Sequence, residues 1–229
     1  IGKFSQYMYS NNPNFDVAFI GRSGRVKIWK ENVIINKVND DFFSKTDYYM
    51  RKKVNNMNIA PNVSVFGGSF FSEERILRYS YSKNINRAKD KLNDFRNCFE
   101  TIRLKKNDYI SKLLLKIERI SPKIREDLNC LIFSESGWIT IRMSHGDLVK
   151  RNILVRANRD PVLIDFEFSA YRSEFYDELF ETYYEDSASF FKQKWDFRIC
   201  VFLLERICLM LKLEQELNVS YRDEIAAAC

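Results

Sequence analysis

The chain has 229 residues and a mass of 27.3 kDa, which is enough to bury a sizeable core in one or two domains. Hydrophobic residues make up 45%, aromatic residues 15% and charged residues 30% of the chain, as is typical of soluble globular proteins. The net charge is +6, but basic and acidic residues are interspersed and no nucleic-acid module is recognisable, so we expect no nucleic-acid partner. No window holds the roughly 18 apolar residues that span a bilayer, so we expect no transmembrane segment.

The cysteines are odd in number and form no CxxC pair: Cys98, Cys130, Cys200, Cys208 and Cys229. With a single histidine in the chain, this pattern argues against a structural zinc site. We therefore expect reduced thiols and a cytoplasmic location. Because the chain opens with isoleucine rather than methionine, we also expect that upstream residues were removed or belong to a larger polypeptide.

The first part of the chain alternates apolar and polar residues, a pattern that is typical of strands. It predicts five short strands, at Phe15–Gly21, Arg25–Glu31, Asn32–Val38, Val63–Phe66 and Arg75–Ser80. After the third strand, the segment Asp40–Met57 places its apolar residues at helical spacing, and Pro61 cannot extend that helix. The expected structure is a five-stranded antiparallel sheet with one inserted helix.

Helical patterns dominate from Asn84 onward. We predict helices at Asn86–Arg103 and Asn107–Ile120, a break at Pro122 followed by a further helical piece through Leu128, and helices from about Ser173 to Leu217. A strand is predicted at Trp138–Met143, and a hairpin around a turn at 158–161 is predicted from Ile153 to Phe166. Placing the boundary at 80–85 predicts a small antiparallel sheet lobe over 1–82 and a mainly helical lobe over 83–229, an α+β fold.

Polar side chains gather around that hairpin. Asp147 and Asn152 lie five residues apart in a loop before the first hairpin strand, and Asp165 follows the second strand. Folding the hairpin brings Asn152 and Asp165 together at its base. Carboxylate and carboxamide oxygens suit Mg²⁺, which typically bridges substrate phosphates. Phosphoryl transfer needs such charge neutralisation, together with a carboxylate that orients the attacking hydroxyl.

These residues resemble the aminoglycoside phosphotransferase and choline kinase superfamily, relatives of the protein kinases. His145-Gly146-Asp147 followed by Asn152 is similar to the superfamily's HGDxxxxN catalytic loop, and Ile164-Asp165-Phe166-Glu167 is similar to its IDFE metal motif. The resemblance implies a two-lobed protein-kinase-like fold with ATP and Mg²⁺ as cofactors. It makes Asp147 the catalytic base and Asn152 and Asp165 the metal ligands, and it gives His145 the role of bracing the catalytic loop. Glu167 either binds a second metal or simply lies near the site.

The same resemblance assigns residues to the nucleotide. Lys37 stands where the fold carries its phosphate-pairing lysine on the third strand, and Asp47 is the nearest match to the lysine's acidic helix partner. The turn from Gly21 through Ser23 to Gly24 is expected to lie over the ATP phosphates, where its backbone N–H groups can bind oxygen atoms. A plain hairpin turn is the alternative for this segment.

The resulting hypothesis is an enzyme that transfers the γ-phosphoryl group of ATP to a hydroxyl of a small molecule or glycan. The acceptor is left open between an amino alcohol, an aminoglycoside and a sugar such as that of a lipopolysaccharide core. Asp177 and Glu178 either bind a cationic acceptor or cap a helix, and the aromatic segment Phe175–Phe191 forms a binding cage, a sugar-stacking surface or core. The competing hypothesis is a pseudokinase-like module for nucleotide binding or protein interaction within a larger protein. Phosphorylation of protein side chains is disfavoured, because no room remains for a long activation segment after Asp165.

Overall fold

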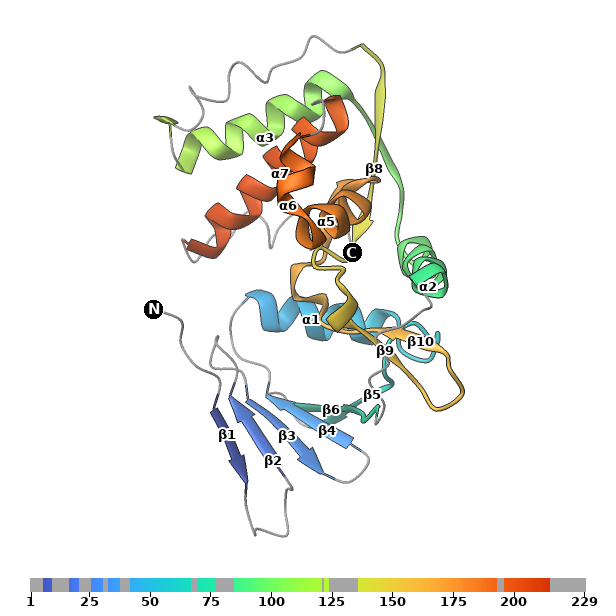
Figure 1. The fold of residues 1–229 in the computed structure, drawn as a ribbon. Coiled ribbons are helices and arrows are strands. Elements are labelled where there is room, and N and C mark those ends of the chain that lie inside the picture. Colours follow the sequence, from blue (N-terminus) through green and yellow to red (C-terminus); the bar gives the residue numbers. More distant parts are fainter. Residues whose placement is uncertain are drawn as a thin grey trace. The chain divides into compact units, whose positions relative to one another are not determined.

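The computed structural model describes residues 6–9, 17–20, 26–30, 33–37, 42–66, 70–76, 85–120, 122–123, 136–192 and 196–214 (Figure 1). The chain divides into two compact units. Unit 1 comprises Ile1–Glu100 and Met143–Tyr171, and unit 2 comprises Thr101–Arg142 and Arg172–Cys229. The predicted lobe boundary falls largely at residues outside the described ranges and stays a prediction. Residues 143–171, predicted to belong to the second lobe, group with unit 1.

Unit 1 contains a six-stranded sheet in the order β1-β2-β3-β4-β6-β5. All neighbouring strands pair antiparallel, as predicted. The strands are β1 (Gln6–Tyr9), β2 (Val17–Ile20), β3 (Val26–Lys30), β4 (Val33–Lys37), β5 (Val63–Phe66) and β6 (Phe70–Glu74). The sequence patterns therefore located four of the predicted strands, and they missed β1.

The fifth predicted strand, Arg75–Ser80, is misplaced where it can be compared. The strand β6 starts at Phe70 and ends at Glu74, Arg75 and Ile76 lie outside any strand, and residues 77–80 lie outside the described ranges. The reason is that β6 buries Ser72 and Glu73, at 5% and 4% exposure. A buried carboxylate breaks the apolar alternation by which strands are recognised.

Helix α1 (Phe42–Lys53) follows β4, where a helix was predicted. It ends before the predicted Met57, because residues 54–58 form turns in which Asn56 and Asn58 adopt positive φ angles of 65° and 58°. Asparagine tolerates this left-handed conformation better than most residues. The Asn55 side chain then ties these turns to β5, since its amide donates to the Val63 carbonyl and its oxygen accepts the Val63 N–H, both at 2.9 Å.

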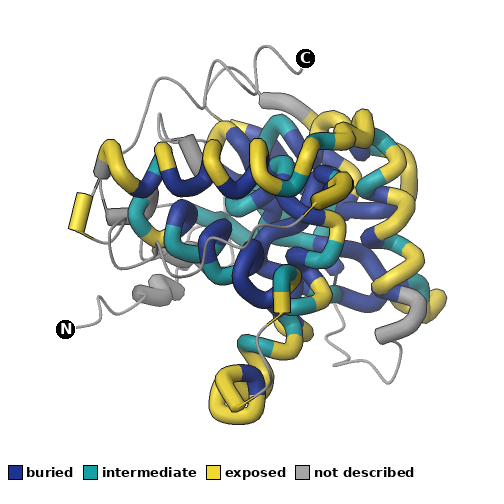
Figure 2. Tube along the Cα trace, turned by 90° about the horizontal axis from the view of Figure 1, so that it is seen from above, coloured by how far each residue is buried: buried dark blue, intermediate teal, exposed yellow. Residues whose placement is uncertain are grey.

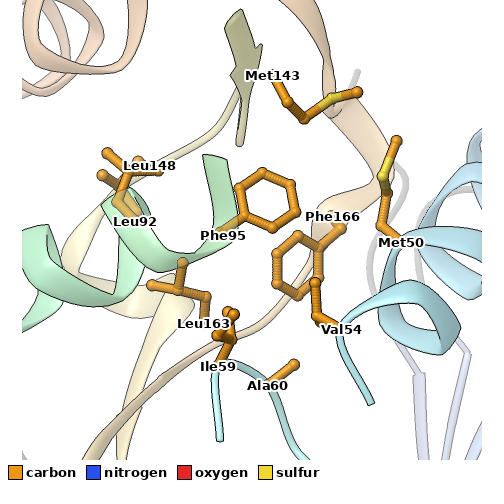
Figure 3. Packing of buried hydrophobic residues seen from close by; sticks show 10 residues of the cluster. All are labelled: Met50, Val54, Ile59, Ala60, Leu92, Phe95, Met143, Leu148, Leu163 and Phe166. Carbon is orange, nitrogen blue, oxygen red and sulfur yellow. The ribbon is translucent and has the colours of Figure 1, made fainter. Parts of the chain in front are cut away.

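The predicted hairpin is present in unit 1. Strand β9 (Ile153–Val155) pairs antiparallel with β10 (Pro161–Leu163), and the short 3-10 helices η2 (Lys150–Asn152) and η3 (Phe166–Phe168) flank it. Helix α2 (Ile85–Asn97) lies against β10. Together, α1, α2, the hairpin and η3 enclose a core in which the Phe95 and Phe166 rings lie 5.1 Å apart (Figure 3). The core residues are Met50, Val54, Ile59, Ala60, Leu92, Phe95, Met143, Leu148, Leu163 and Phe166.

The remaining elements are β7 (Ile102–Lys105), α3 (Lys106–Ile120), β8 (Trp138–Ser144), β11 (Ala170–Ser173), α5 (Tyr176–Glu185), α6 (Ser187–Lys192) and α7 (Phe197–Glu214). A three-stranded sheet has the order β11-β8-β7. The strand β7 corrects the predicted helix Asn86–Arg103, which ends at Asn97 instead. Residues of β7 pair with β8 far along the chain, and no local pattern reports such a pairing.

The helices bury one side and expose the other, so dark blue and yellow alternate along their turns (Figure 2). Helix α7 packs on α3 in unit 2 and buries Ile199, Val201, Phe202 and Leu204. No helix within the described ranges is long and apolar enough to cross a membrane.

Candidate active site

The predicted catalytic loop follows directly on β8. Its first residues are buried, and Asp147 and Asn152 are 8% and 4% exposed. The Asn152 amide nitrogen donates to the Asp147 carboxylate at 3.1 Å and to its backbone carbonyl at 2.8 Å. The loop therefore closes on itself and holds the two predicted site residues in direct contact.

The hairpin places Asp165 at the same end of the ladder as Asn152. The last ladder pair joins Ile153 to Leu163, and the Ile164 N–H then donates to the Asn152 carbonyl at 3.0 Å. Asp165 follows immediately, with φ 67° and ψ 59°. A left-handed backbone is uncommon for a residue other than glycine and is frequent at functional sites.

His145 links the predicted catalytic loop to the segment that carries Asp165. The side chain is fully buried, and its Nε2 atom lies 2.9 Å from the Ile164 carbonyl oxygen. The ring packs 4.9 Å from the Phe166 ring, and the Ser169 hydroxyl donates to the His145 carbonyl at 3.3 Å. These contacts are those of a brace, which is the role that the resemblance implied for this residue.

Asp47, the predicted partner of Lys37, is engaged by other groups. Its Oδ1 atom accepts hydrogen bonds from Arg51 Nε and from the Phe166 backbone N–H, both at 2.9 Å. Lys37 is exposed at the end of β4, and within the described residues no ion pair joins it to Asp47. The assignment of Lys37 to the nucleotide stays a prediction.

Some of the other predicted site residues lie within the described part of the chain and some do not. Gly21, Ser23 and Gly24 lie outside the described residues. Glu167 follows Phe166 within η3 and is half-buried. Arg151, in η2, is half-exposed and places its Nη2 atom 3.3 Å from Asp147 Oδ2, so a cation lies beside the predicted catalytic base.

One interpretation of Asp177 and Glu178 was that they bind a cationic acceptor. Both residues lie at the start of α5, but their surroundings differ. Asp177 is fully buried, whereas Glu178 is exposed and pairs with Arg198 at 3.4 Å. The aromatic segment 175–191 contributes mainly to the core of unit 2, since Tyr176, Phe180 and Phe190 are buried. Tyr184 and Phe191 remain about half exposed, at 51% and 48%.

The residues at the base of the hairpin fit a magnesium ion by their donor chemistry. The nitrogen of the Asn152 amide is committed to Asp147, which leaves the amide oxygen as the atom for a metal. Mg²⁺ is usually held by one or two carboxylates together with substrate phosphates and water. Within the described ranges, no group of three or more His, Cys, Asp or Glu side chains could hold a metal ion.

Arg51 and Glu73 were missed in the sequence. Arg51 is 1% exposed, and its Nη1 atom donates to Glu73 Oε2. Asp47 and Arg51 are four residues apart on one helix, and that spacing alone predicts their pairing. The buried Glu73 gave no such local signal, because its partner lies on a different element.

No protein-family model and no curated protein matches the sequence. Solved structures do match. The crystal structure of choline kinase LicA from Streptococcus pneumoniae is 13% identical, with a TM-score of 0.50 over 96% of this chain and 89% of that one. The crystal structure of macrolide 2'-phosphotransferase MphH from Brachybacterium faecium is 12% identical, with a TM-score of 0.50 over 98% of this chain and 91% of that one. These likenesses confirm that the chain has the kinase-like α+β fold that choline kinases and antibiotic phosphotransferases share.

Proposed function

We propose that the chain is an ATP- and Mg²⁺-dependent phosphotransferase that transfers the γ-phosphoryl group to a hydroxyl of a small molecule or glycan. The observation that carries the proposal is the contact between Asn152 and the Asp147 carboxylate, at the end of the hairpin from which Asp165 continues. The fold supports it, because a choline kinase and a macrolide phosphotransferase are among the solved structures that match.

Each residue has a distinct task in this proposal. Asp147 orients the acceptor hydroxyl and takes its proton, and the hydrogen bond from Asn152 fixes the direction of the carboxylate. Asn152 and Asp165 would hold the metal, with Glu167 as a candidate second-metal ligand. Bound Mg²⁺ would neutralise charge on the phosphates. Lys37 is exposed, so its ammonium group is accessible to a nucleotide.

The proposal is tested by removing one carboxylate at a time. We expect Asp165→Ala to abolish Mg²⁺-dependent turnover of ATP, and Asp147→Ala to lower kcat by about 10²–10⁴-fold while nucleotide binding persists. ADP release is measured with a panel of amino alcohols, aminoglycosides and sugars, and nucleotide binding by thermal shift. Asp160→Ala, at the opposite end of the same hairpin, is the matched control and should retain wild-type turnover. Wild-type rates in both site variants would refute the assignment.

A second candidate is a nucleotide-binding module with weak or no catalysis. It is favoured by one observation: Asp47 is engaged by Arg51 rather than by the strand lysine. Thermal shift with ATP separates the two candidates. A Mg²⁺-dependent shift that Asp165→Ala removes, accompanied by turnover, supports the enzyme. A shift without turnover of any acceptor supports the module.

A further inference from the structure

One buried cation in unit 1 joins two carboxylates from different elements. Arg51 extends from α1 with 1% exposure, and its guanidinium binds Asp47 of the same helix and Glu73 of β6. Both carboxylates are themselves buried, at 5% and 4% exposure. A planar guanidinium can bind two carboxylates in fixed directions, which a single ammonium group cannot do equally well.

Glu73 is anchored in the sheet. Its Oε1 atom accepts a hydrogen bond at 3.0 Å from the amide of Asn36, which is buried in β4. The backbone of β6 pairs with β4 on one side and with β5 on the other, so Glu73 sits on a central strand. The sheet therefore holds Glu73 in place, and Glu73 in turn holds the Arg51 guanidinium.

The other end of the network reaches the segment that carries Asp165. Asp47 Oδ1, which accepts from Arg51, also accepts the Phe166 N–H at 2.9 Å. That peptide group directly follows Asp165, whose φ of 67° is in the left-handed region. The Phe166 ring is fully buried beside Phe95 and Val54, so the residue after Asp165 is held by both its backbone and its side chain (Figure 3). A backbone in this region persists when its surroundings fix it.

Charge makes Arg51 the central member of this network. Burial alone would lower the pKa of Arg51, but attraction to the carboxylates of Asp47, Glu73 and Asp165, together with the hydrogen bond to Asp47, outweighs it and raises that pKa. The predicted lysine is exposed and does not pair with Asp47 within the described residues. Without Arg51, the two buried carboxylates lose the cation that pairs with both of them, and Asp47 loses the hydrogen bond that fixes its carboxylate from within α1.

We propose that Arg51 is a positioning residue for the metal site, which acts through Asp47 to hold the backbone at Asp165 and Phe166. Arg51 thus supplies, from within the same helix, the cation that pairs with Asp47. The inference rests on the proposed function, because that proposal makes Asp165 a metal ligand. The Arg51 side chain itself does not contact the substrate in this scheme.

The first test needs neither metal nor nucleotide. Amide hydrogen exchange at Phe166 is measured in the wild-type chain, in Arg51→Met and in Arg51→Lys, with the Ile164 amide as the internal reference, since it donates to Asn152 instead. We expect Arg51→Met to speed exchange at Phe166 by about tenfold relative to Ile164, and Arg51→Lys to restore part of the protection. Arg156→Met is the matched control: Arg156 also holds a carboxylate of β6, that of Glu74, and its other hydrogen bonds among the described residues go to Asn58 and Ala60.

The second test separates positioning from general stability. The thermal shift is measured with ADP at increasing Mg²⁺ concentrations. The Mg²⁺ concentration that gives half of the maximal shift should rise by about tenfold in Arg51→Met. The KM for the acceptor should stay at the wild-type value. Arg156→Met should leave both quantities unchanged.

The outcomes distinguish the two proposals. Phe166 exchange that stays at the wild-type rate in a folded Arg51→Met overturns the positioning role, as does equal acceleration in Arg156→Met. If Arg51→Met does not fold, the double variant Arg51→Met/Glu73→Gln, which removes one of the unpaired charges, is measured in its place. A wild-type chain without any Mg²⁺-dependent shift refutes the proposed function, whereas the exchange result still decides the structural half of the inference.

Discussion

Glu205 is an ionisable residue in the core of unit 2. It is 3% exposed on α7, and burial raises its pKa from 4.5 to about 7. Three hydrogen bonds oppose that rise: the Tyr109 hydroxyl donates at 2.6 Å, and Ser173 donates from its N–H at 2.6 Å and from its hydroxyl at 2.8 Å. The nearby Arg172 also lowers the pKa, yet desolvation outweighs all of these groups.

The raised pKa predicts that stability falls as the pH rises. Between pH 4.5 and about 7 the unfolded chain releases a proton that folded Glu205 retains, so the free energy of unfolding falls through this window, by about 3 kcal/mol in all. Glu205→Gln should remove this contribution, because the amide oxygen can accept from Tyr109 and from the Ser173 N–H. Urea unfolding at pH 5 and pH 8 measures the difference.

Two further variants serve as comparisons for Glu205→Gln. Glu205→Ala leaves the donors of Tyr109 and Ser173 without their acceptor, so it should lose about 2–4 kcal/mol at both pH values. Glu178→Gln alters an exposed glutamate of the same unit and should follow the wild-type pH dependence. A Glu205→Gln chain with the wild-type pH dependence would show that Glu205 is not the titrating group.

At the scale of elements, aromatic packing holds α2 to the segment of the candidate active site that contains Phe166. Phe95 is fully buried and contacts the rings of Phe166 at 5.1 Å and of Phe99 at 5.3 Å. Phe95→Ala should therefore lower the free energy of unfolding by about 3–5 kcal/mol, through lost burial and a cavity. Phe99→Ala, at the half-buried edge of the same cluster, should lose clearly less. Equal losses in denaturant titrations would argue against a core role for Phe95.

Elements fixed by local chemistry could be predicted from the sequence. The hairpin β9–β10 follows from a turn at 158–161 between two apolar runs, and the positions of Asn152 and Asp165 at its base follow from the hairpin. The contact between Asp147 and Asn152 spans only five residues. Because each of these relations is local, the sequence alone predicts the contact between Asp147 and Asn152 and the placement of Asn152 and Asp165 at one end of the hairpin.

The misplaced elements depend on partners that are remote in the sequence. The strand β7 exists because Ile102 and Leu104 pair with β8, more than thirty residues later. Arg51 and Glu73 lie 22 residues apart, and Asp47 and Phe166 lie 119 residues apart. No periodicity within one segment reports such pairings, so the network that anchors α1 could only be seen in three dimensions.

At the scale of the whole molecule, the fold persists with very little sequence identity. The choline kinase and the macrolide phosphotransferase that match are 12–13% identical over 96–98% of this chain. Packing constraints can be met by many combinations of apolar residues, provided that volume and pattern are kept. A chain can therefore carry Arg51 and Glu73 at the core of its sheet unit and still adopt the kinase-like fold.

Unit 1 is discontinuous, and this predicts how fragments behave. Its core combines Phe95 and other residues of the first hundred with Met143, Leu148, Leu163 and Phe166. A fragment of residues 1–100 should therefore lack a cooperative thermal transition and near-ultraviolet circular dichroism, because it cannot bury its apolar faces. A fragment of residues 1–171, which contains all of unit 1, should regain both. Cooperative melting of the shorter fragment would show that the later segment is dispensable.

The same discontinuity determines when the core of unit 1 can be completed during synthesis of the chain. Once Glu100 has been added, the apolar residues of α1 and α2 still lack part of their core, because Met143, Leu148, Leu163 and Phe166 are encoded beyond Arg142. At about 5–20 residues per second, the ribosome needs roughly 4–14 s to add residues 101–171. Throughout that interval the nascent chain exposes an incomplete core, which is the kind of surface that chaperones bind. Codon usage between positions 101 and 171 should accordingly affect the yield of folded protein more than codon usage after position 171.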